Sequence, residues 1–487
     1  MSVFSIEILL VVLGVGLLLL EALVPSLTRR ALASISLGGA ALALVLFFFA
    51  DKSAAALPAF AQPFHQLDTL AVFYKGFALV ITLAVLWLTV ESRAYLERYT
   101  PGGRHGEMFS LPLIVCAGMM WMASAKDLIT VFVCLELVTV SFYVLVAFAR
   151  KSSFALEAGV KYLILGALST GVLVYGIAWT YGVTDSMSFE GIAEALAAPA
   201  TAKNAALLGA AFLLAGLGFK VAAAPFHIWV PDVYQGAPNP VTAFLSVGSK
   251  AAGFIVLTRV VDAFMAKGSV IASEVQALLL IGGALTVLLG SLPAIFQTNL
   301  KRLLAYSSIS HAGYLLLALG CAQTARFDLD GSSVAAFYLG TYLPMTVLGF
   351  LILTVVRQAG LGDDAQDFAG LAKKNPFLAF AATLGFASLA GIPLTAGFMG
   401  KLFVFLGLVE NAHWFALSCA VIGAAAGFYY YLRPVLVMFT GESGPALKIA
   451  APTRAVLVLL AGAILVIGVF PKPLQGVLKV PVASATK

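Results

Sequence analysis

The segment GFKVAAAPFHIWVPDVYQGAPNPVTAFLSVGSKAAGF, residues 218–254, decides how this chain folds. It is apolar and contains four prolines, yet it places Lys220 and Lys250 among apolar side chains. The apolar stretch 205–235 around its first half is roughly ten residues longer than a bilayer crossing requires. Pro225, in the middle of that stretch, lacks an N–H group and clashes with the preceding turn, so we expect the helix to break there.

A broken helix at membrane depth is stable only where protein or water satisfies the freed backbone groups. A lysine beside such a break therefore indicates a transport site. The alternative is that Lys220 reaches a membrane interface from the end of a badly delimited helix. Apolar sequence continues well beyond Lys220 in both directions, which favours the buried position.

The composition is that of an integral membrane protein. Of the 487 residues, 61% are hydrophobic and 11% are charged, and the mean hydropathy is +1.01. Soluble proteins carry roughly 25% charged residues. The net charge of +6 comes from basic residues scattered singly between apolar runs, a pattern that does not indicate nucleic-acid binding.

We expect this chain to bind no cofactor and no metal. Its four cysteines (Cys116, Cys134, Cys321 and Cys419) lie in separate apolar segments without paired spacing, so they indicate core packing rather than zinc, iron–sulfur or disulfide sites. No glycine-rich fingerprint follows a strand and no P-loop is present, which excludes the usual nucleotide and flavin sites. Ordered waters and lipids are the expected non-protein components.

The fold class predicted from this pattern is all-α, with about 14 transmembrane helices. The predicted segments are 5–25, 31–50, 69–90, 107–124, 127–149, 154–181, 205–235 (broken), 239–264, 275–296, 301–321, 332–357, 376–408 (broken), 412–438 and 453–471. The first segment is too long and too weakly basic at its front for a cleaved signal. An even count places both termini on the same side of the membrane.

The distribution of basic residues predicts on which side of the membrane the termini lie, because cytoplasmic loops carry the excess of lysine and arginine. One set of alternate loops holds Arg29, Arg30, Arg93, Arg98, Arg104, Arg150, Lys151, Lys301, Arg302, Arg357, Lys373, Lys374, Arg433, Lys448 and Arg454. The other set holds Lys52, Lys126, Lys203, Lys267 and Arg326, plus three lysines in the C-terminal tail. The first set is predicted to be cytoplasmic, with both termini on the outer, periplasmic side of a bacterial inner membrane.

An internal repeat divides the chain. ELVTVSFYVLVAFA (136–149) is echoed by SSISHAGYLLLALG (307–320), and LLAGLGFKVAAAPF (213–226) by LAGIPLTAGFMGKLF (389–403), at a spacing of about 170 to 175 residues. Five spans separate the copies, so the two units are predicted to be inverted relative to each other, as in many transporters. The predicted parts are an N-terminal three-helix segment (1–106), repeats at 107–264 and 275–438, and a C-terminal helix and tail (439–487). The second broken segment carries Pro393 at its break and Lys401 just beyond.

Four ionisable residues fall near the middle of their spans: Glu136, Lys220, Lys250 and Lys401. Each costs at least about 2.5–3.5 kcal/mol at the bilayer centre, so we expect them to face each other or water. Burial disfavours the charged form of a lysine, and an opposite neighbour restores it. Glu136 is placed to do this for Lys220, and we predict that this pair gates proton transfer. The alternative is a static ion pair that holds two helices in register.

Other polar residues carry weaker signals. His227 follows the break and His311 lies midway along its span; either can relay protons or be a satisfied core histidine. Glu157 and Lys161, one turn apart, form either a stabilising pair near the interface or the mouth of a cytoplasmic proton path. The hydroxyls of residues 306–310 either support a water chain or bond back to their own helix. Glu7, Glu21 and Lys75 lie near span ends, where snorkelling suffices.

These motifs resemble a known family. The opening segment, together with DLITVFVCLELVTVSFYVL, LKRLLAYSSISHAGYLL, LAGIPLTAGFMGKLFVF and YYYLRPVLVMF, resembles the antiporter-like subunits of respiratory complex I, the proton-translocating NADH–quinone oxidoreductase. Within that family DVYQGAPNPV is similar to the N type rather than to the L type, the M type or the Mrp-type cation/proton antiporters. The chain also carries no extension like the long lateral helix of the L type.

The resemblance implies specific roles. Glu136, Lys220, Lys250 and Lys401 match the family's proton-transfer positions, the last of which is a glutamate in the M type; Pro225, His227 and Glu157 also match its pattern. As a subunit of a translocating oxidoreductase, the chain would pass protons while other subunits hold NADH, FMN, iron–sulfur clusters and quinone. Its implied neighbours are the M-type subunit, small membrane subunits, and the lateral helix of the L-type subunit.

Two other functions are weighed against this one. A self-sufficient sodium/proton antiporter would need a cluster of carboxylates or unwound carbonyls near mid-membrane, and Glu136 is the one carboxylate that the sequence places there. A structural spacer would tolerate the loss of Lys220 without any change in proton pumping.

Overall fold

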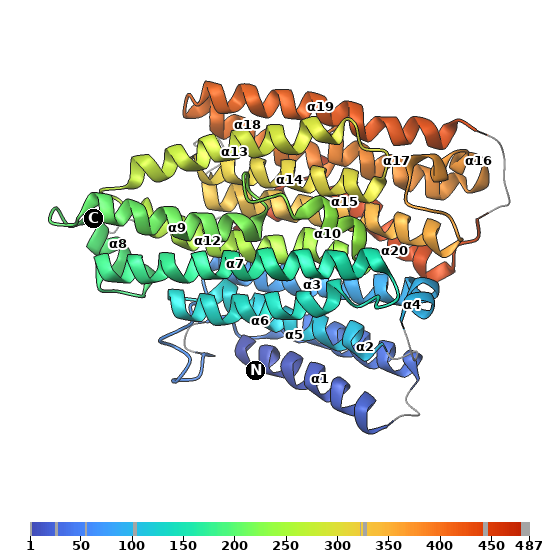
Figure 1. Ribbon diagram of the computed structural model, residues 1–487, viewed down its shortest axis with the longest axis horizontal. Helices are drawn as coiled ribbons and strands as arrows, with labels where there is room; N and C mark the ends of the chain where they lie inside the picture. The colour runs from blue at the N-terminus through green and yellow to red at the C-terminus, as the bar shows by residue number, and fades with distance from the viewer. Residues whose placement is uncertain are drawn as a thin grey trace.

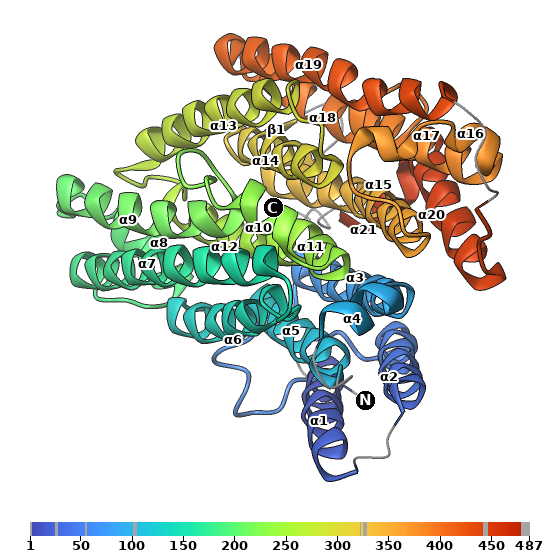
Figure 2. The same ribbon diagram turned by 45° about the vertical axis from the view of Figure 1, so that its right-hand side comes forward.

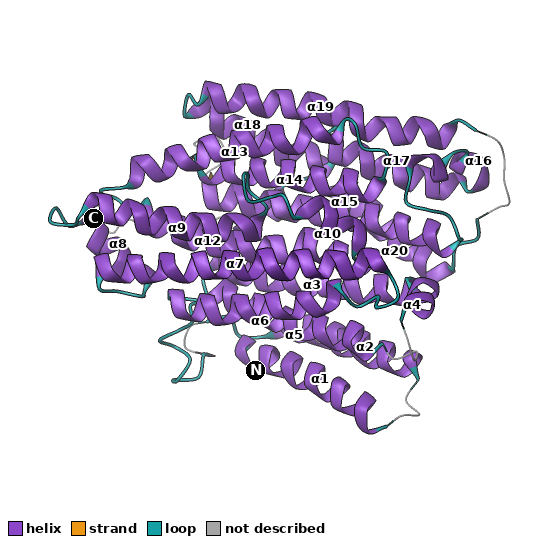
Figure 3. Ribbon diagram, in the orientation of Figure 1, coloured by secondary structure: helices purple, strands orange, loops and turns teal. Residues whose placement is uncertain are grey.

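The computed structural model describes residues 2–24, 28–53, 56–100, 105–321, 323–324, 329–441 and 447–478. Figure 3 shows that this part of the chain is built almost entirely of helices. Two-residue strands β1 (Gln323–Thr324) and β2 (Leu329–Asp330) pair antiparallel and are the exception. The prediction of a helical membrane protein is confirmed in its class.

The helices follow the predicted apolar segments closely. The first part of the chain forms α1 (Val3–Leu23), α2 (Arg29–Phe49), α3 (Thr69–Glu91), α4 (Arg93–Tyr99), α5 (Gly106–Ser124), α6 (Leu128–Val146), α7 (Ser153–Thr184), α8 (Phe189–Ala197), α9 (Lys203–Val221), α10 (Val230–Gly236), α11 (Asn239–Phe244), the π-helix η3 (Leu245–Ser249) and α12 (Lys250–Phe264). The second part forms α13 (Ala272–Ala294), α14 (Leu300–Leu319), α15 (Gly331–Gln358), the 3-10 helix η4 (Ala365–Phe368), α16 (Leu371–Lys374), α17 (Pro376–Ala390), α18 (Ala396–Glu410), α19 (Trp414–Phe439), α20 (Ala451–Val469) and α21 (Lys472–Leu478).

Twelve of the described helical segments are long and apolar enough to cross a membrane. The sequence predicted fourteen crossings, and the difference lies in two places. Helix α14 carries Lys301, Arg302, His311 and several hydroxyls, which lower its hydropathy. Helices α17 and α18 are each 15 residues long, because the chain is broken between them.

The loops gather at two ends of the bundle. At one end, Arg29 donates to the Thr89 carbonyl at 3.0 Å. At the same end, the Lys151 N–H donates to the Tyr99 carbonyl and the Leu300 N–H donates to the Asp363 carbonyl. At the other end, isolated bridges join residues 2 with 51, 65 with 125, and 127 with 188. Figure 1 shows α4 and α16 at one end and α8 at the other. The described members of the two predicted sets of alternate loops therefore lie at opposite ends, and we call the first the basic end. Arg104, Arg326, Lys479 and Lys487 lie outside the described residues.

The first predicted break is present, slightly earlier than expected. Helix α9 ends at Val221, and Ala222 adopts a left-handed conformation with φ of 64°, three residues before Pro225. The freed backbone groups find partners: the Trp229 indole donates to the Phe219 carbonyl at 3.2 Å, and the Ala224 N–H donates to Thr286 Oγ1 at 2.9 Å. Such pairing is what allows irregular backbone inside a membrane protein.

The second break has the same form. Helix α17 ends at Ala390, and Gly391 takes a φ of 90°, a conformation that glycine adopts without steric cost. A side-chain Cβ at Gly391 would also lie 3.1 Å from the Lys401 side chain. After Pro393 the chain resumes as α18, and the Gly397 N–H donates to Ser388 Oγ at 3.1 Å.

Burial separates central from peripheral helices. Helix α15 and the α11–α12 segment are almost entirely buried, whereas α1, α2, α7 and α20 expose many apolar side chains. Figure 2 shows α15 and α11 in the interior of the bundle, with α1 and α19 at opposite edges. Exposed apolar faces on long helices are the surfaces expected to contact lipid or neighbouring subunits.

Candidate functional site

The first cluster of polar groups surrounds Lys220 in the last turn of α9. Its ammonium lies 3.9 Å from Glu136 Oε1 and donates to Thr139 Oγ1 at 2.9 Å and to Thr170 Oγ1 at 3.4 Å. The Thr170 hydroxyl in turn donates to Glu136 at 2.8 Å. The predicted pair is therefore present, with a threonine bridge instead of a direct contact. We call these four residues the Lys220 cluster.

Close helix packing builds this cluster. Glycines on α9 face α7 so closely that a Cβ at Gly216 would lie 2.8 Å from the Leu173 Cα, and Ser169 donates to the Gly216 carbonyl at 3.0 Å. Small residues allow membrane helices to approach in this way. The approach brings Thr170 of α7 beside Lys220.

The second cluster surrounds Lys250, directly after the π-helix η3. The ammonium donates to the Ser308 carbonyl and to Ser308 Oγ at 2.6 Å. Ser308 Oγ also lies 3.4 Å from Ser246 Oγ and 3.2 Å from the Tyr234 hydroxyl, and Ser246 pairs with the Tyr342 hydroxyl at 2.8 Å. Single π-helical turns occur frequently at functional sites.

His311 continues this row on α14. Its Nδ1 lies 2.7 Å from the Tyr338 hydroxyl and its Nε2 lies 3.2 Å from the Tyr431 hydroxyl, which also pairs with Ser307. The imidazole ring centre is 4.8 Å from that of Tyr342, next to Lys250. Ser307 and Ser308 of α14 thus bond to hydroxyls on other helices. The alternative in which these hydroxyls bond back to their own helix is wrong for these two serines.

Lys401 lies at the second break. Its ammonium donates to the carbonyls of Leu389 at 3.0 Å and Ala390 at 2.8 Å, the last residues of α17. It also lies 5.6 Å from the Tyr314 ring centre, and that ring is 6.3 Å from His311. A cation at a helix C-terminus is stabilised by the unpaired carbonyls and the helix dipole.

The four predicted residues thus fall into two groups. A buried row of hydroxyls and aromatic rings leads from Lys250 through His311 to Lys401. Among the described residues no hydrogen bond joins this row to the Lys220 cluster. The helices that carry Lys220 and Lys250 nevertheless touch, since a Cβ at Gly253 would lie 3.5 Å from the Lys220 carbonyl carbon.

Three further histidines lie away from the buried row. His227 lies half-buried in the linker after Pro225, and its Nδ1 has no hydrogen-bond partner in the described part of the chain. His65 and His105 lie outside the spans, and burial lowers the pKa of each to about 4. Near neutral pH both therefore stay uncharged.

Glu157 and Lys161 form the predicted pair at 2.7 Å, and both side chains are partly exposed. Lys161 also contacts Asp232 at 2.7 Å, and Asp232 pairs with Arg302 at 2.8 Å. The pair is one part of a network that ties α7, α10 and α14 together near the basic end. The sequence did not indicate Asp232 as the residue that links them.

Two lysines differ from their predicted environments. Lys75 contacts Glu7, and the two side chains are only 2% and 1% exposed, so neither snorkels to an interface. Lys301, assigned to a loop by the charge pattern, is fully buried. Glu21, in contrast, does lie at a span end, where it accepts the Gly106 N–H at 2.9 Å and caps α5. The first two errors arose because hydropathy places a residue along a helix but does not say which neighbour it faces.

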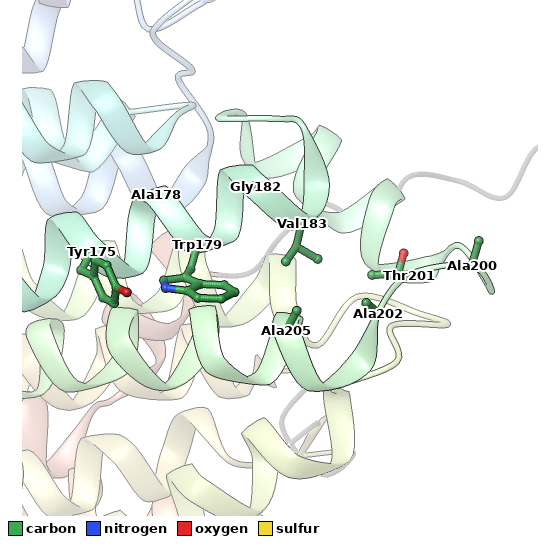
Figure 4. Close-up of a pocket in the computed structure, with 9 residues that line it drawn as sticks. All are labelled: Tyr175, Ala178, Trp179, Gly182, Val183, Ala200, Thr201, Ala202 and Ala205. Atoms are coloured by element: carbon green, nitrogen blue, oxygen red, sulfur yellow. The ribbon is translucent and has the colours of Figure 1, made fainter.

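Two hollows lie away from these charges. A cavity of about 370 Å³ at the first break is lined by Pro225, Phe226 and apolar residues of α9 and α13. A surface groove of about 730 Å³ between α7 and the start of α9 is lined by Tyr175, Trp179 and small residues (Figure 4). The described residues that line the two hollows include no charged side chain, so the buried charges remain the candidate site.

Comparison with known proteins identifies the family of this chain. The family model described as NADH:quinone oxidoreductase/Mrp antiporter, TM, matches residues 125–427. NADH-quinone oxidoreductase subunit N of Desulfitobacterium hafniense is 36% identical, over 100% of this chain and 99% of that one. The subunit N of Trichlorobacter lovleyi is 40% identical, over 97% of this chain and 94% of that one.

Solved structures share the fold. A chain of respiratory complex I from Thermus thermophilus aligns with a TM-score of 0.79 at 32% identity, covering 97% of this chain and 98% of that one. A chain of the Mrp complex from Dietzia sp. aligns with a TM-score of 0.81 at 21% identity, over 98% and 96%. The fold and the buried charges define a multi-span, antiporter-like membrane subunit. The chain belongs to the NADH:quinone oxidoreductase/Mrp antiporter family, and within it to the N subunits of NADH-quinone oxidoreductase.

Proposed function

We propose that this subunit translocates protons across the membrane through Glu136, Lys220, Lys250 and Lys401 while other subunits of the oxidoreductase reduce quinone. The buried row from Lys250 through His311 to Lys401 carries this proposal, because a hydrated chain of titratable groups is the reason to place charges inside a membrane. The full-length likeness to N subunits supports it.

The roles of the residues follow from their contacts. Glu136, near Lys220, favours the charged lysine; when the carboxylate withdraws, the desolvated ammonium releases its proton. Lys250 receives protons through the hydroxyl of Ser308, and His311 with its tyrosine partners passes them toward Lys401. Lys161, Glu157 and His227 are secondary groups in this scheme, the first two near the basic end.

The architecture is proposed as fourteen crossings in two inverted five-helix repeats. The two breaks support this, because both α9 and α17 end in a left-handed residue followed by a proline linker. The basic end is proposed to face the cytoplasm of a bacterial cell, and both termini the outer side. The edges formed by α1–α2 and by α19 suit neighbours on two sides, an M-type subunit and small membrane subunits, with the lateral helix of the L type alongside.

The decisive experiment replaces Lys220 with alanine in the assembled complex. The expected result is a lower proton-to-electron ratio with NADH oxidation retained, measured in proteoliposomes. Lys203→Ala is the matched control, because Lys203 begins the same helix but is half-exposed and pairs with Glu274. An unaltered ratio in Lys220→Ala complexes would refute the proposal and leave a structural spacer.

A second candidate is an independent sodium/proton antiporter, which the fold likeness to an Mrp complex favours. The purified chain would then exchange sodium for protons in liposomes without partners. We expect no such exchange, because Glu136 stands as a single carboxylate beside Lys220.

A further inference from the structure

Among the described residues, Lys301 is the most deeply buried lysine that the proposed row does not use. It is the second residue of α14, and its side chain is completely inaccessible, although Thr298 three residues earlier is exposed. Its ammonium donates to the carbonyl of Ala237 at 2.5 Å, directly after α10. Lys301 therefore turns inward at the basic end of the bundle.

A ladder of hydroxyls leads from Lys301 toward Lys250. The Thr242 hydroxyl lies 3.4 Å from the same Ala237 carbonyl, and its closer acceptors are the carbonyls of Pro238 at 3.1 Å and Tyr234 at 3.2 Å. Thr242, Ser246 and Lys250 follow one another at intervals of four residues, so they lie on one face of the α11–α12 segment. One helical turn separates Thr242 from Ser246, and Ser246 meets Ser308, the partner of Lys250.

The facing helix repeats this alignment. Lys301 and Ser308 lie seven residues apart on α14, and His311 follows three residues later, which places all three on one side of that helix. Thr242, Ser246 and Ser308 are each fully buried. A polar strip inside an otherwise apolar core thus connects the basic end with mid-membrane.

The outer side of Lys301 is charged. Asp363 accepts a bond from Arg357 at 3.0 Å through Oδ2, while its Oδ1 is buried without a hydrogen-bond partner among the described residues. The Leu300 N–H, next to Lys301, donates to the Asp363 carbonyl. Arg302, on the other flank, pairs with Asp232. Lys301 thus lies between a charged surface layer and the buried hydroxyl ladder.

Capping of α10 alone would give Lys301 a purely structural role. The C-terminus of α10 does attract cations. A cap needs neither complete burial nor a connection to Lys250, however. Lys374 caps in the simpler way, because it donates to the Ala369 carbonyl at 3.0 Å while partly buried and far along the chain from the ladder.

We propose that Lys301 is the intake lysine through which protons from the basic end reach Lys250 by way of Thr242, Ser246 and Ser308. This inference rests on the proposed proton translocation by the same row. The Lys301 ammonium bonds the Ala237 carbonyl, so in each passage it gives one proton to a bridging water, which passes one to the Thr242 hydroxyl. The neutral amine then takes one proton from water at the basic end. Ser308 gives a proton to the neutral Lys250 amine. No electrons move in these steps.

The test uses assembled complexes that carry Lys301→Arg. Arginine keeps the positive charge and can bond the Ala237 carbonyl, but it does not release its proton in proteins. The intake role therefore predicts that the proton-to-electron ratio falls to that of Lys220→Ala while the complex assembles. A capping role predicts the wild-type ratio, because arginine restores the cap.

Thr242→Val is the second variant, because it removes one hydroxyl with almost no change of shape and leaves Lys301 in place. It is expected to lower the proton-to-electron ratio as well, and Lys374→Met, the matched control, is expected to leave it unchanged. A wild-type ratio in both Lys301→Arg and Thr242→Val overturns the intake role. If Lys301→Arg fails to assemble, Thr242→Val decides alone. A loss in Lys220→Ala without loss in either Lys301→Arg or Thr242→Val would retain the proposed function and reject the intake lysine.

Discussion

In the described part of the chain, the lysine–glutamate pairs Lys75–Glu7 and Lys220–Glu136 lie inside the bundle and differ in their geometry. Glu7 and Lys75 touch directly, and both side chains are at most 2% exposed. Glu136 and Lys220 lie 3.9 Å apart, the glutamate is 28% exposed, and Thr170 bridges them. The first pair joins α1 to α3; the second joins α6 to α9 at the break.

We infer from this difference that one pair is static and that the other changes its geometry during proton transfer. A buried pair in direct contact is held, because separating it exposes each charge to an apolar environment. A pair bridged by hydroxyls changes its coupling when either side chain shifts by one hydrogen bond, and the partial exposure of Glu136 lowers the cost of that shift. We therefore propose that Glu7 and Lys75 form a static pair, and that Glu136 and Lys220 form the pair that gates proton transfer.

The largest effect on stability is expected for Lys75→Met. Removal of one partner leaves the Glu7 carboxylate buried and unpaired, which costs about 3–5 kcal/mol. The measurement is the thermal-unfolding midpoint and yield of the assembled complex. The proton-to-electron ratio of those complexes that assemble should stay normal; a specific loss of pumping would make this pair part of the proton path.

The double variant Glu7→Lys with Lys75→Glu sharpens this test. It restores the pair in reverse order, so most of the stability lost in Lys75→Met should return. The corresponding exchange of Glu136 and Lys220 should assemble but fail to pump, because the lysine would no longer lie at the break.

A smaller effect on stability is expected for the second pair. The coupling between Glu136→Gln and Lys220→Met, measured by a double-mutant cycle on the unfolding midpoint, should be about 1 kcal/mol, at the low end for residues in one network. Glu136→Gln alone should lower the proton-to-electron ratio strongly. A coupling as large as that of Glu7 and Lys75 would contradict the proposal that Glu136 and Lys220 form a gating pair and not a static one.

The smallest effect is expected for Thr170→Val. Loss of one bridging hydroxyl costs about 0.5 kcal/mol, at the low end for one hydrogen bond, and it should slow proton transfer without abolishing it, since Thr139 still accepts from Lys220. The initial rate of proton uptake by proteoliposomes measures this. Thr184→Val is the control on the same helix. The Thr184 hydroxyl donates to the Thr180 carbonyl within α7 at 2.8 Å and so bridges no charged pair. Equal rates for both variants would exclude the bridge from the path.

Much of the site could be predicted from the sequence. Lysines inside long apolar runs and prolines inside segments too long for one span indicated Lys220, Lys401 and both breaks. The partners Thr139, Thr170, Ser246 and Tyr342 gave no such signal, because hydroxyl and aromatic residues are common in spans and only contact distinguishes them. Glu7 and Lys75 were assigned to span ends and Lys301 to a loop, because the sequence does not show which neighbour a charged side chain faces.

The sequence by itself determined that this chain is a bundle of membrane helices with two interruptions, because hydropathy and proline chemistry act locally along the backbone. It also indicated that Lys220, Lys250 and Lys401 are buried. Only the tertiary structure decided which lysine faces a carboxylate, which rests on helix carbonyls and which begins a hydroxyl ladder. Those choices depend on how helices distant in sequence rotate and approach one another, and no local property of the chain encodes that rotation.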